Sequence, residues 1–331
     1  MDILLQEKVD LMVENFYKIK QSFKWDTSLI KHFGAIIHAT KGKAVDIETL
    51  EIIKKHIKDN TGLTSYFRGT NMFILANLLS FEKDYKGFLK NITEVYELMR
   101  REGFKNSIYM PLAAYTIAKE IPMDQWSIRI TRMFNLYKNM RTNHFWLTAP
   151  DDYVFAAVLA TTDFDLQQVD SEIEKCYNLL NQEGFRKGKD LQALSHVLAI
   201  GEEIYIDKCK RAMKLYSGLK SEKCKLQYNG LATLGVLSLI NQDTDKIVKD
   251  VKEVYDYLKE RNGYGIWGLN TSMRTILAST LVCDSYVDKL KNGVLNMALG
   301  NSINAILIAQ QQAMVAAACA ASASAAASAN S

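Results

Sequence analysis

Residues 246–260 read KIVKDVKEVYDYLKE, with apolar side chains recurring every three or four positions between charged ones. Val251, Val254, Tyr255 and Leu258 fall on one face of a helix with 3.6 residues per turn. The other positions are mostly charged. The stretch therefore predicts an amphipathic helix that has one face in the protein and the other in water.

The same stripe recurs seven times along the chain, at intervals of 39, 40, 41, 40, 39 and 39 residues. Its anchor positions are Tyr17, His56, Tyr96, Tyr137, Tyr177, Tyr216 and Tyr255. An apolar side chain stands four residues before each anchor: Val13, Ile52, Ile92, Met133, Ile173, Ala212 and Val251. A fixed period near forty is typical of stacked helix pairs, in which each unit buries its apolar face only against its neighbours.

Segments of a different character separate these amphipathic helices. Five of them contain no Asp, Glu, Lys or Arg: residues 71–81, 110–118, 153–162, 191–201 and 229–241. An earlier segment, residues 28–39, carries Lys31, and a last one, residues 271–283, carries Arg274. A helix with so little charge is covered by protein on most sides. We call these segments the charge-poor helices.

The alternation predicts an all-α fold of about fifteen helices, arranged as about seven helix-pair repeats of about 40 residues in one domain over residues 1–300. Two architectures fit it. In an α/α toroid the charge-poor helices ring a central cavity, and in an open α-solenoid they line a groove. Because more charge is expected on an exposed groove, the lack of charge favours the toroid.

Bulk composition restricts the function classes. The net charge of +4 comes from 41 basic and 37 acidic residues mixed along the chain, which does not favour a nucleic-acid partner. Five cysteines without a CxxC pair suggest neither a disulfide framework nor a zinc site. No ligand cluster or cofactor-binding motif stands out, so we expect no metal and no cofactor. The N-terminus does not resemble a signal peptide, and we expect a cytoplasmic location.

Residues 301–331 form an Ala/Ser-rich C-terminal region without charge. Residues 305–321 fall short of the about 20 apolar residues of a membrane span and include Gln310, Gln311 and Gln312. We therefore expect no membrane span, but a packed helix over 305–321 and a loose tail over 322–331. Such a tail could also pack against the same tail of another subunit, and a further protein partner stays open.

The loops that lead from amphipathic to charge-poor helices collect aromatic residues: Phe104, Phe145, Trp146, Phe185, Tyr264 and Trp267. We call these loops the aromatic rim. Helix N-termini meet there and favour an anionic or polar ligand. The candidate binding residues on this rim are Arg68, His144, Trp146, Asp151, Asp152 and Trp267. Local roles compete with binding, because Asp151 and Asp152 precede a helix and Arg68 could pair with Asp151 or Asp190.

Three runs carry a resemblance: SYFRGTNM at residues 65–72, HFWLTAPDDYVFAA at 144–157 and YNGLATLGVL at 228–237. They resemble an uncharacterised bacterial family, catalogued as a domain of unknown function, that would cover nearly the whole chain. More loosely, the ending Tyr-x-x-Leu-x-x-x-Gly-Phe resembles repeats of prenyltransferases and terpene cyclases, which are α/α toroids. Their zinc ligands and full acidic motif are missing, so this second resemblance concerns the fold alone.

Two function classes remain. The first is a non-catalytic helical-repeat binding or assembly protein of the bacterial cytoplasm, since repeat architectures mainly present large surfaces. The second is an α/α-toroid enzyme whose central cavity acts on a hydrophobic or peptide-like substrate. An enzyme would bring Arg68 together with Asp151 or Asp152 as converging polar groups. Side chains that only cap helices would leave the enzyme hypothesis without this support.

Overall fold

The structure is a computed structural model that describes residues 1–24, 26, 28–227, 230–240 and 242–291. Within these residues the chain forms fourteen α-helices, two short 3-10 helices and no β-strand. The all-α prediction is confirmed. The predicted helix over 305–321 and the tail over 322–331 lie outside the described residues.

The described chain divides into two compact units. Unit 1 consists of residues 1–10 and the described residues from 164 to 291, and unit 2 consists of residues 11–163. The amphipathic helices are α1 (Ile3–Ser22), α3 (Ile47–Asp59), α5 (Tyr85–Glu102), α7 (Trp126–Asn143), α9 (Leu166–Gln182), α11 (Tyr205–Ser221) and α13 (Thr244–Lys259). The charge-poor helices are α2 (Ser28–Thr40), α4 (Thr70–Leu79), α6 (Met110–Glu120), α8 (Tyr153–Ala160), α10 (Lys189–Leu198), α12 (Gly230–Ser238) and α14 (Thr271–Lys291). A single domain over 1–300, and a toroid rather than a solenoid, stay predictions.

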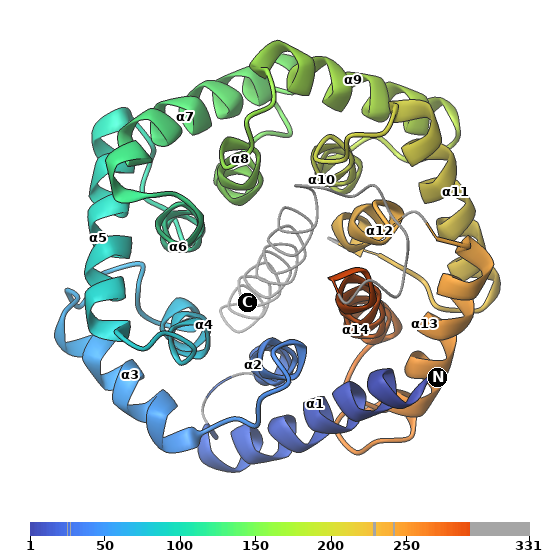
Figure 1. Ribbon diagram of the computed structural model, residues 1–331, viewed down its shortest axis with the longest axis horizontal. Coiled ribbons are helices and arrows are strands. Elements are labelled where there is room, and N and C mark those ends of the chain that lie inside the picture. The colour runs from blue at the N-terminus through green and yellow to red at the C-terminus, as the bar shows by residue number, and fades with distance from the viewer. Residues whose placement is uncertain (25, 27, 228–229, 241, 292–331) are drawn as a thin grey trace, which may run out of the picture. The chain divides into compact units, whose positions relative to one another are not determined.

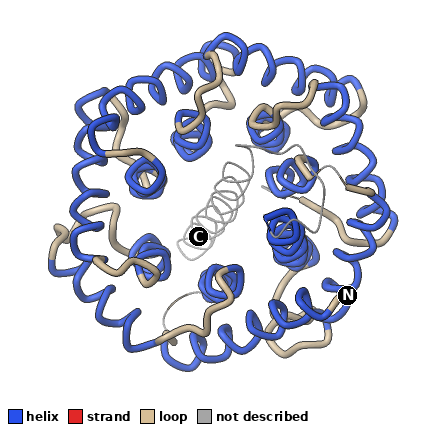
Figure 2. The backbone as a smooth tube through the Cα atoms, in the orientation of Figure 1, coloured by secondary structure: helices blue, strands red, loops and turns tan. Residues whose placement is uncertain are grey.

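Each unit has two rows of helices. In unit 2, α3, α5 and α7 pack in one row and α2, α4, α6 and α8 in the other. In unit 1, the rows are α9, α11 and α13, and α10, α12 and α14. Figure 1 shows the charge-poor helices end-on and the amphipathic helices lengthwise, so helices of the two rows cross. Most of the described residues between the helices form loops that join the rows (Figure 2).

The apolar stripe of the amphipathic helices faces the core. In α13 the side chains of Val251, Val254, Tyr255 and Leu258 are buried. The anchors Tyr96, Tyr137 and Tyr177 are buried in the same way, and Tyr216 is half-buried. The repeat pattern therefore identifies the buried face of these five helices.

The first two anchors are one residue out of register. Tyr17 and His56 are only half-buried, and Ile52 is half exposed. The buried positions are Phe16, at 1% exposure, and Ile57, at 0%. Burial of the apolar isoleucine and phenylalanine side chains gains more free energy than burial of the histidine and tyrosine beside them, which carry polar atoms. The helices therefore turn Ile57 and Phe16 inward. The first interval becomes 41 residues and the second 39, so the period near forty is kept.

Capping contacts at the helix ends hold the loops in place. Asp46, Asp84, Asp165 and Asp243 accept hydrogen bonds from backbone N–H groups at the starts of α3, α5, α9 and α13. At the end of α5, Gly103 has φ 115° and its N–H donates to the carbonyl of Met99. Phe104 then packs back edge-on against Tyr153, as predicted for the aromatic rim.

The first residues of the chain pack against the last described helices of unit 1. Lys8 on α1 forms a buried ion pair with Asp284 on α14. Tyr257 and Glu253 lie on α13. The hydroxyl of Tyr257 donates to Asp10 on α1, and Glu253 pairs with the ammonium group of Met1, just before α1. These contacts cover the flank of α13 and α14 within unit 1.

The burial of Ile57 in place of His56 leads to a prediction about stability. Replacing Ile57 by Ala should lower the free energy of unfolding by about 3 kcal/mol, because it opens a cavity in the core. Replacing the adjacent His56 by Ala should cost less than about 1 kcal/mol, since that side chain is partly in water. Urea denaturation of both variants measures the difference. Equal losses, or a larger loss for His56→Ala, would contradict the register.

Unit 2 also contains a buried histidine that should make its stability depend on pH. His38, at the end of α2, lies 4.8 Å from the ring of Phe81, measured between ring centroids. Burial lowers its pKa from 6.5 to about 4. Because the unfolded chain binds this proton more tightly, stability is lost as the pH falls from about 6.5 toward 4. This contribution amounts to about 2 kcal/mol between pH 7.5 and pH 5.

Urea denaturation of the wild type and of His38→Leu at these two pH values isolates this contribution. The wild type should lose about 2 kcal/mol more than the variant on going to pH 5, because leucine does not titrate. Carboxylates that titrate in this range affect both proteins alike. The same pH dependence in both proteins would show that His38 does not set it.

Candidate functional site

The residues predicted to bind a ligand on the aromatic rim lie in both units. Arg68, His144, Trp146, Asp151 and Asp152 belong to unit 2, and Trp267 belongs to unit 1. We therefore describe them within their own units. Their role in binding stays a prediction.

Arg68 completes a helix end. One terminal nitrogen of its guanidinium, Nη2, donates to the carbonyl of Lys58 at 2.6 Å and to that of Thr61 at 2.7 Å. Both acceptors lie at or just beyond the end of α3. A basic side chain that satisfies the free carbonyls at a helix C-terminus is a common cap. Arg68 thus holds its own loop together.

The loop between α7 and α8 uses its polar groups in a similar way. The carbonyl of His144 accepts the N–H groups of Leu147 and Thr148, each at 2.9 Å. Asp152 is buried, and its carboxylate accepts the N–H of Ala149 at 3.0 Å. This contact supports a local role of Asp152 at the start of the helix. Asp151 beside it is only half-buried.

The members of the aromatic rim differ in burial. Phe104 and Tyr264 are buried, whereas Trp146 is 90% and Trp267 is 102% exposed. Phe145 lies edge-on to Trp146 with ring centroids 5.2 Å apart, and Arg141 lies over the Phe145 ring. Cap packing thus accounts for Phe104 and Tyr264 but leaves Trp146 and Trp267 in water.

A cavity lies within unit 1. It is an open groove of about 730 Å³ between the start of α9 and the loop that joins α10 to α11. Its charged and apolar lining includes Asp165, Glu172, Lys175, Glu202, Glu203 and Ile204. We call it the α9 groove. Its volume lies in the range of ligand pockets.

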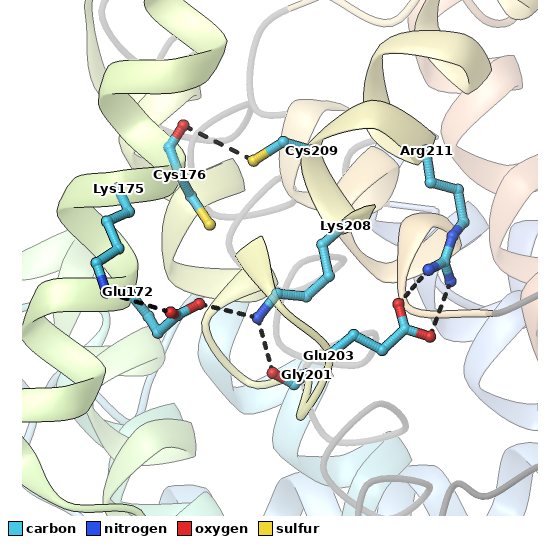
Figure 3. A network of polar contacts seen from close by, with 8 residues as sticks. All are labelled: Glu172, Lys175, Cys176, Gly201, Glu203, Lys208, Cys209 and Arg211. Carbon is cyan, nitrogen blue, oxygen red and sulfur yellow. Dashed lines mark hydrogen bonds and ion pairs between the residues drawn. The ribbon is translucent and has the colours of Figure 1, made fainter. Parts of the chain in front are cut away.

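A buried lysine holds the two walls of the groove together (Figure 3). Lys208, on α11, is 1% exposed. Its ammonium donates to the carbonyl of Gly201 at 2.7 Å and pairs with the carboxylate of Glu172 on α9 at 3.3 Å. A Cβ atom at Gly201 would lie 2.6 Å from Cδ2 of Leu239 and 3.1 Å from Cδ of Lys208, so a larger residue would require these side chains to move. The ammonium therefore joins α9, α11 and the loop.

Most of the other charged groups near the groove are engaged as well. The guanidinium of Arg211 reaches both carboxylate oxygens of Glu203, and Lys175 lies 3.8 Å from Glu172 (Figure 3). Asp165 accepts the N–H groups of Gln167 and Gln168 as the cap of α9. Glu202 and Ile204 are exposed at the mouth. The groove thus has a fixed, paired floor below an acidic and partly apolar edge.

Two thiols lie beside this network without forming a reactive site. Cys176 on α9 and Cys209 on α11 are both fully buried, and the Cys209 sulfur lies 4.0 Å from the carbonyl oxygen of Cys176 (Figure 3). The hydrogen bond between the thiols, together with burial, raises the pKa of Cys176, and the same hydrogen bond lowers the pKa of Cys209. A nucleophilic cysteine needs access to solvent, which neither buried thiol has. The pair therefore contributes to packing.

The sequence did not reveal the α9 groove, although part of its signal is visible. Gly201-Glu-Glu-Ile ends a charge-poor segment with two carboxylates and a branched apolar residue. Lys208 looks like an ordinary lysine of an amphipathic helix, and only the folded structure brings it to Glu172. Among the described residues, no group of three or more His, Cys, Asp and Glu side chains is placed to hold a metal ion. No helix of that same part is long and apolar enough to span a membrane.

The buried lysine makes a testable contribution. Replacing Lys208 by Met keeps the chain length but leaves the Gly201 carbonyl without its donor, which should cost about 2 kcal/mol of unfolding free energy. Lys175→Met is the matched control, since the Lys175 side chain is 49% exposed and its pair with Glu172 is long. It should change stability by less than about 0.5 kcal/mol. Denaturant midpoints of the two variants that coincide would contradict this role of Lys208.

Comparison with known proteins leads to a family without an assigned activity. The uncharacterised protein YeaA of Bacillus subtilis (strain 168) is 24% identical over 323 residues, which cover 95% of this chain and 94% of that protein. No solved structure matches the chain. A family model described as a protein of unknown function (DUF4003) matches residues 15–312. The resemblance to an uncharacterised family is thus confirmed, and the chain belongs to the DUF4003 family of proteins of unknown function.

Proposed function

We propose that the protein is a non-catalytic helical-repeat binding protein whose partner enters the α9 groove of unit 1. The observation that carries the proposal is the arrangement of charge in this groove. Glu172 and Glu203 are held by Lys208 and Arg211, whereas Glu202 and Ile204 face solvent at the edge. A fixed floor below an exposed edge suits recognition of a surface.

The alternative of an enzyme has less support. The enzyme hypothesis requires Arg68 to converge with Asp151 or Asp152 at the mouth of a cavity. Arg68 instead donates to carbonyls at the end of α3, and Asp152 accepts an N–H of its own loop. Side chains that are engaged in this way hold their loops in shape, which favours a binding role over the enzyme hypothesis.

The lining of the groove suggests the chemistry of the partner. The carboxylate of Glu202, exposed at the mouth, favours a cationic group. Ile204 is 62% exposed and offers an apolar contact at the same edge. We infer that the partner presents basic side chains next to an apolar one.

Two further parts of the proposal concern location and assembly. A cytoplasmic location is supported by Cys176, Cys209, Cys224 and Cys283, which are all free thiols. Self-association through the Ala/Ser-rich tail concerns residues outside the described range. Deletion of residues 302–331 tests it: a changed oligomeric state with the helical repeats still folded would support it, and unchanged elution and melting would contradict it.

The groove is tested with a labelled peptide that contains lysines beside one phenylalanine. Fluorescence anisotropy should detect binding of this peptide and not of the same peptide with glutamates in place of the lysines. The double variant Glu202→Lys with Ile204→Asp should weaken binding at least tenfold, because it reverses the charge and removes the apolar contact. Both side chains are exposed, so the fold should be unaffected.

Two control variants complete the test. Ile128→Asp changes an isoleucine of similar exposure on α7 and should leave binding unchanged. Trp146→Ala tests the aromatic rim of unit 2 in the same assay. Binding that is lost on Trp146→Ala and kept in the groove variant would overturn the assignment to the groove and favour the rim.

A further inference from the structure

A second feature of unit 1 is a loop that presents apolar side chains to water. The loop between α13 and α14 carries Ile266, which is 75% exposed, and Trp267, which is 102% exposed. Large apolar side chains at neighbouring positions rarely face solvent together in a soluble protein unless a partner covers them. We call this pair the Trp knob.

The loop is built to hold the Trp knob in place. Arg274, on α14, is buried and donates to the carbonyls of Tyr264 and Leu269, each at 2.7 Å, and to the hydroxyl of Tyr255 at 2.9 Å. Its two carbonyl acceptors flank the knob on either side. A Cβ atom at Gly268 would lie 2.1 Å from the carbonyl oxygen of Gly263, so the turn closes only with glycine there. The exposure of the knob is thus a feature of a fixed loop.

Exposed basic side chains lie at the same end of unit 1 as the Trp knob. Exposed lysines on this end of the unit include Lys223, Lys225 and Lys259. The loop that carries Lys223 and Lys225 is tied to the start of α14, because Gln227 and the hydroxyl of Ser272 exchange two hydrogen bonds, at 2.8 and 2.7 Å. Glu222 and Glu260 offset part of this charge. The three exposed lysines outnumber these two glutamates at this end of the unit.

The Trp knob and the α9 groove lie at opposite ends of the charge-poor row. The Gln227–Ser272 contact places the starts of α12 and α14 together, and Gly201, after α10, lies against Leu239, after α12. The three helices therefore run in the same direction. The knob precedes α14 and the groove follows α10, so about 14 Å of helix separates them along a row whose middle helix, α12, has 9 residues. A pinned loop cannot cross this distance to reach the groove of its own chain.

We propose that the Trp knob of one copy docks into the α9 groove of a second copy. This inference rests on the proposed function, since it takes the groove as the binding site and names its partner. The knob is exposed and apolar at an end of the unit that carries exposed lysines, and the groove is concave with Glu202 and Ile204 at its edge. Tryptophan is among the residues that contribute most to protein interfaces, and complementary charges favour the correct partner.

The geometry predicts the kind of assembly. Each copy offers one knob and one groove on different surfaces, so the contact is head-to-tail and can repeat from copy to copy. A single loop in a groove buries less than the roughly 1,200 Å² of a stable interface, so the association should be weak and concentration-dependent. It should also weaken with added salt, because exposed charges are screened.

Complementation between two variants of the full-length chain tests the proposal. The knob variant is Ile266→Ala with Trp267→Ala, and the groove variant is Glu202→Lys with Ile204→Asp. Light scattering after size-exclusion chromatography should show that the mass of the wild type grows with concentration while each variant stays monomeric. An equimolar mixture of the two variants should form dimers and nothing larger, because only one intact knob and one intact groove remain between them.

Four results would overturn the proposal. They are a wild type that stays monomeric, association that survives in both variants, association lost only on deletion of residues 302–331, and a mixture that behaves as its separate components. A monomeric wild type that binds vesicles of anionic phosphatidylglycerol, and loses this binding in the knob variant, would make the knob a membrane contact.

The peptide assay separates this failure from failure of the proposed function. If the wild type stays monomeric but the groove variant still loses the lysine-rich peptide, only the choice of a second copy is wrong. If the groove variant loses neither the peptide nor self-association, the groove itself is not the binding site.

Discussion

The fold depends on one-sided burial. Each amphipathic helix carries an apolar stripe that it cannot cover alone, and the stripe is buried by a charge-poor helix and by the adjacent amphipathic helices in the same unit. A helix at the end of such a row would leave this surface in water. In unit 1 the first ten residues cover α13 and α14, and the ion pair between Lys8 and Asp284 is buried there. Such a pair fixes which segments pack together, because removing either partner alone would leave a buried charge.

Much of the fold follows from the periodicity of the sequence. The two buried positions that periodicity assigns wrongly have a physical reason. Tyr96, Tyr137, Tyr177 and Tyr255 mark buried faces because each lies within an unambiguous apolar stripe. In α1 and α3, two neighbouring residues compete for the anchor position, and spacing alone selects the wrong one. Burial favours Phe16 over Tyr17 and Ile57 over His56, since tyrosine and histidine can keep their polar atoms in water. Periodicity thus gives the helix and its face to within one residue.

The candidate sites were harder to predict, because their contacts join residues far apart in the chain. Lys208 meets Glu172 across 36 positions, and neither residue stands out in its own helix. Arg68 drew attention as a possible anion ligand, yet the nearest acceptors are carbonyls of its own loop. An arginine near a helix end can serve either purpose, and only the folded loop decides between them. Local sequence therefore identifies the residue type that a loop needs and not the partner that it finds.

Arg274 links the apolar stripe of a helix to the shape of a neighbouring loop. It is a lone charge in a charge-poor segment, and burying such a group is costly unless its donors are satisfied. Two backbone carbonyls and the hydroxyl of the anchor Tyr255 satisfy it. The same tyrosine that closes the apolar stripe of α13 therefore also helps to hold the loop before α14. Because the buried arginine fixes both sides of this loop, the exposure of Ile266 and Trp267 follows from the packing of the repeat itself, and a surface for a partner is formed without any further ordering of the chain.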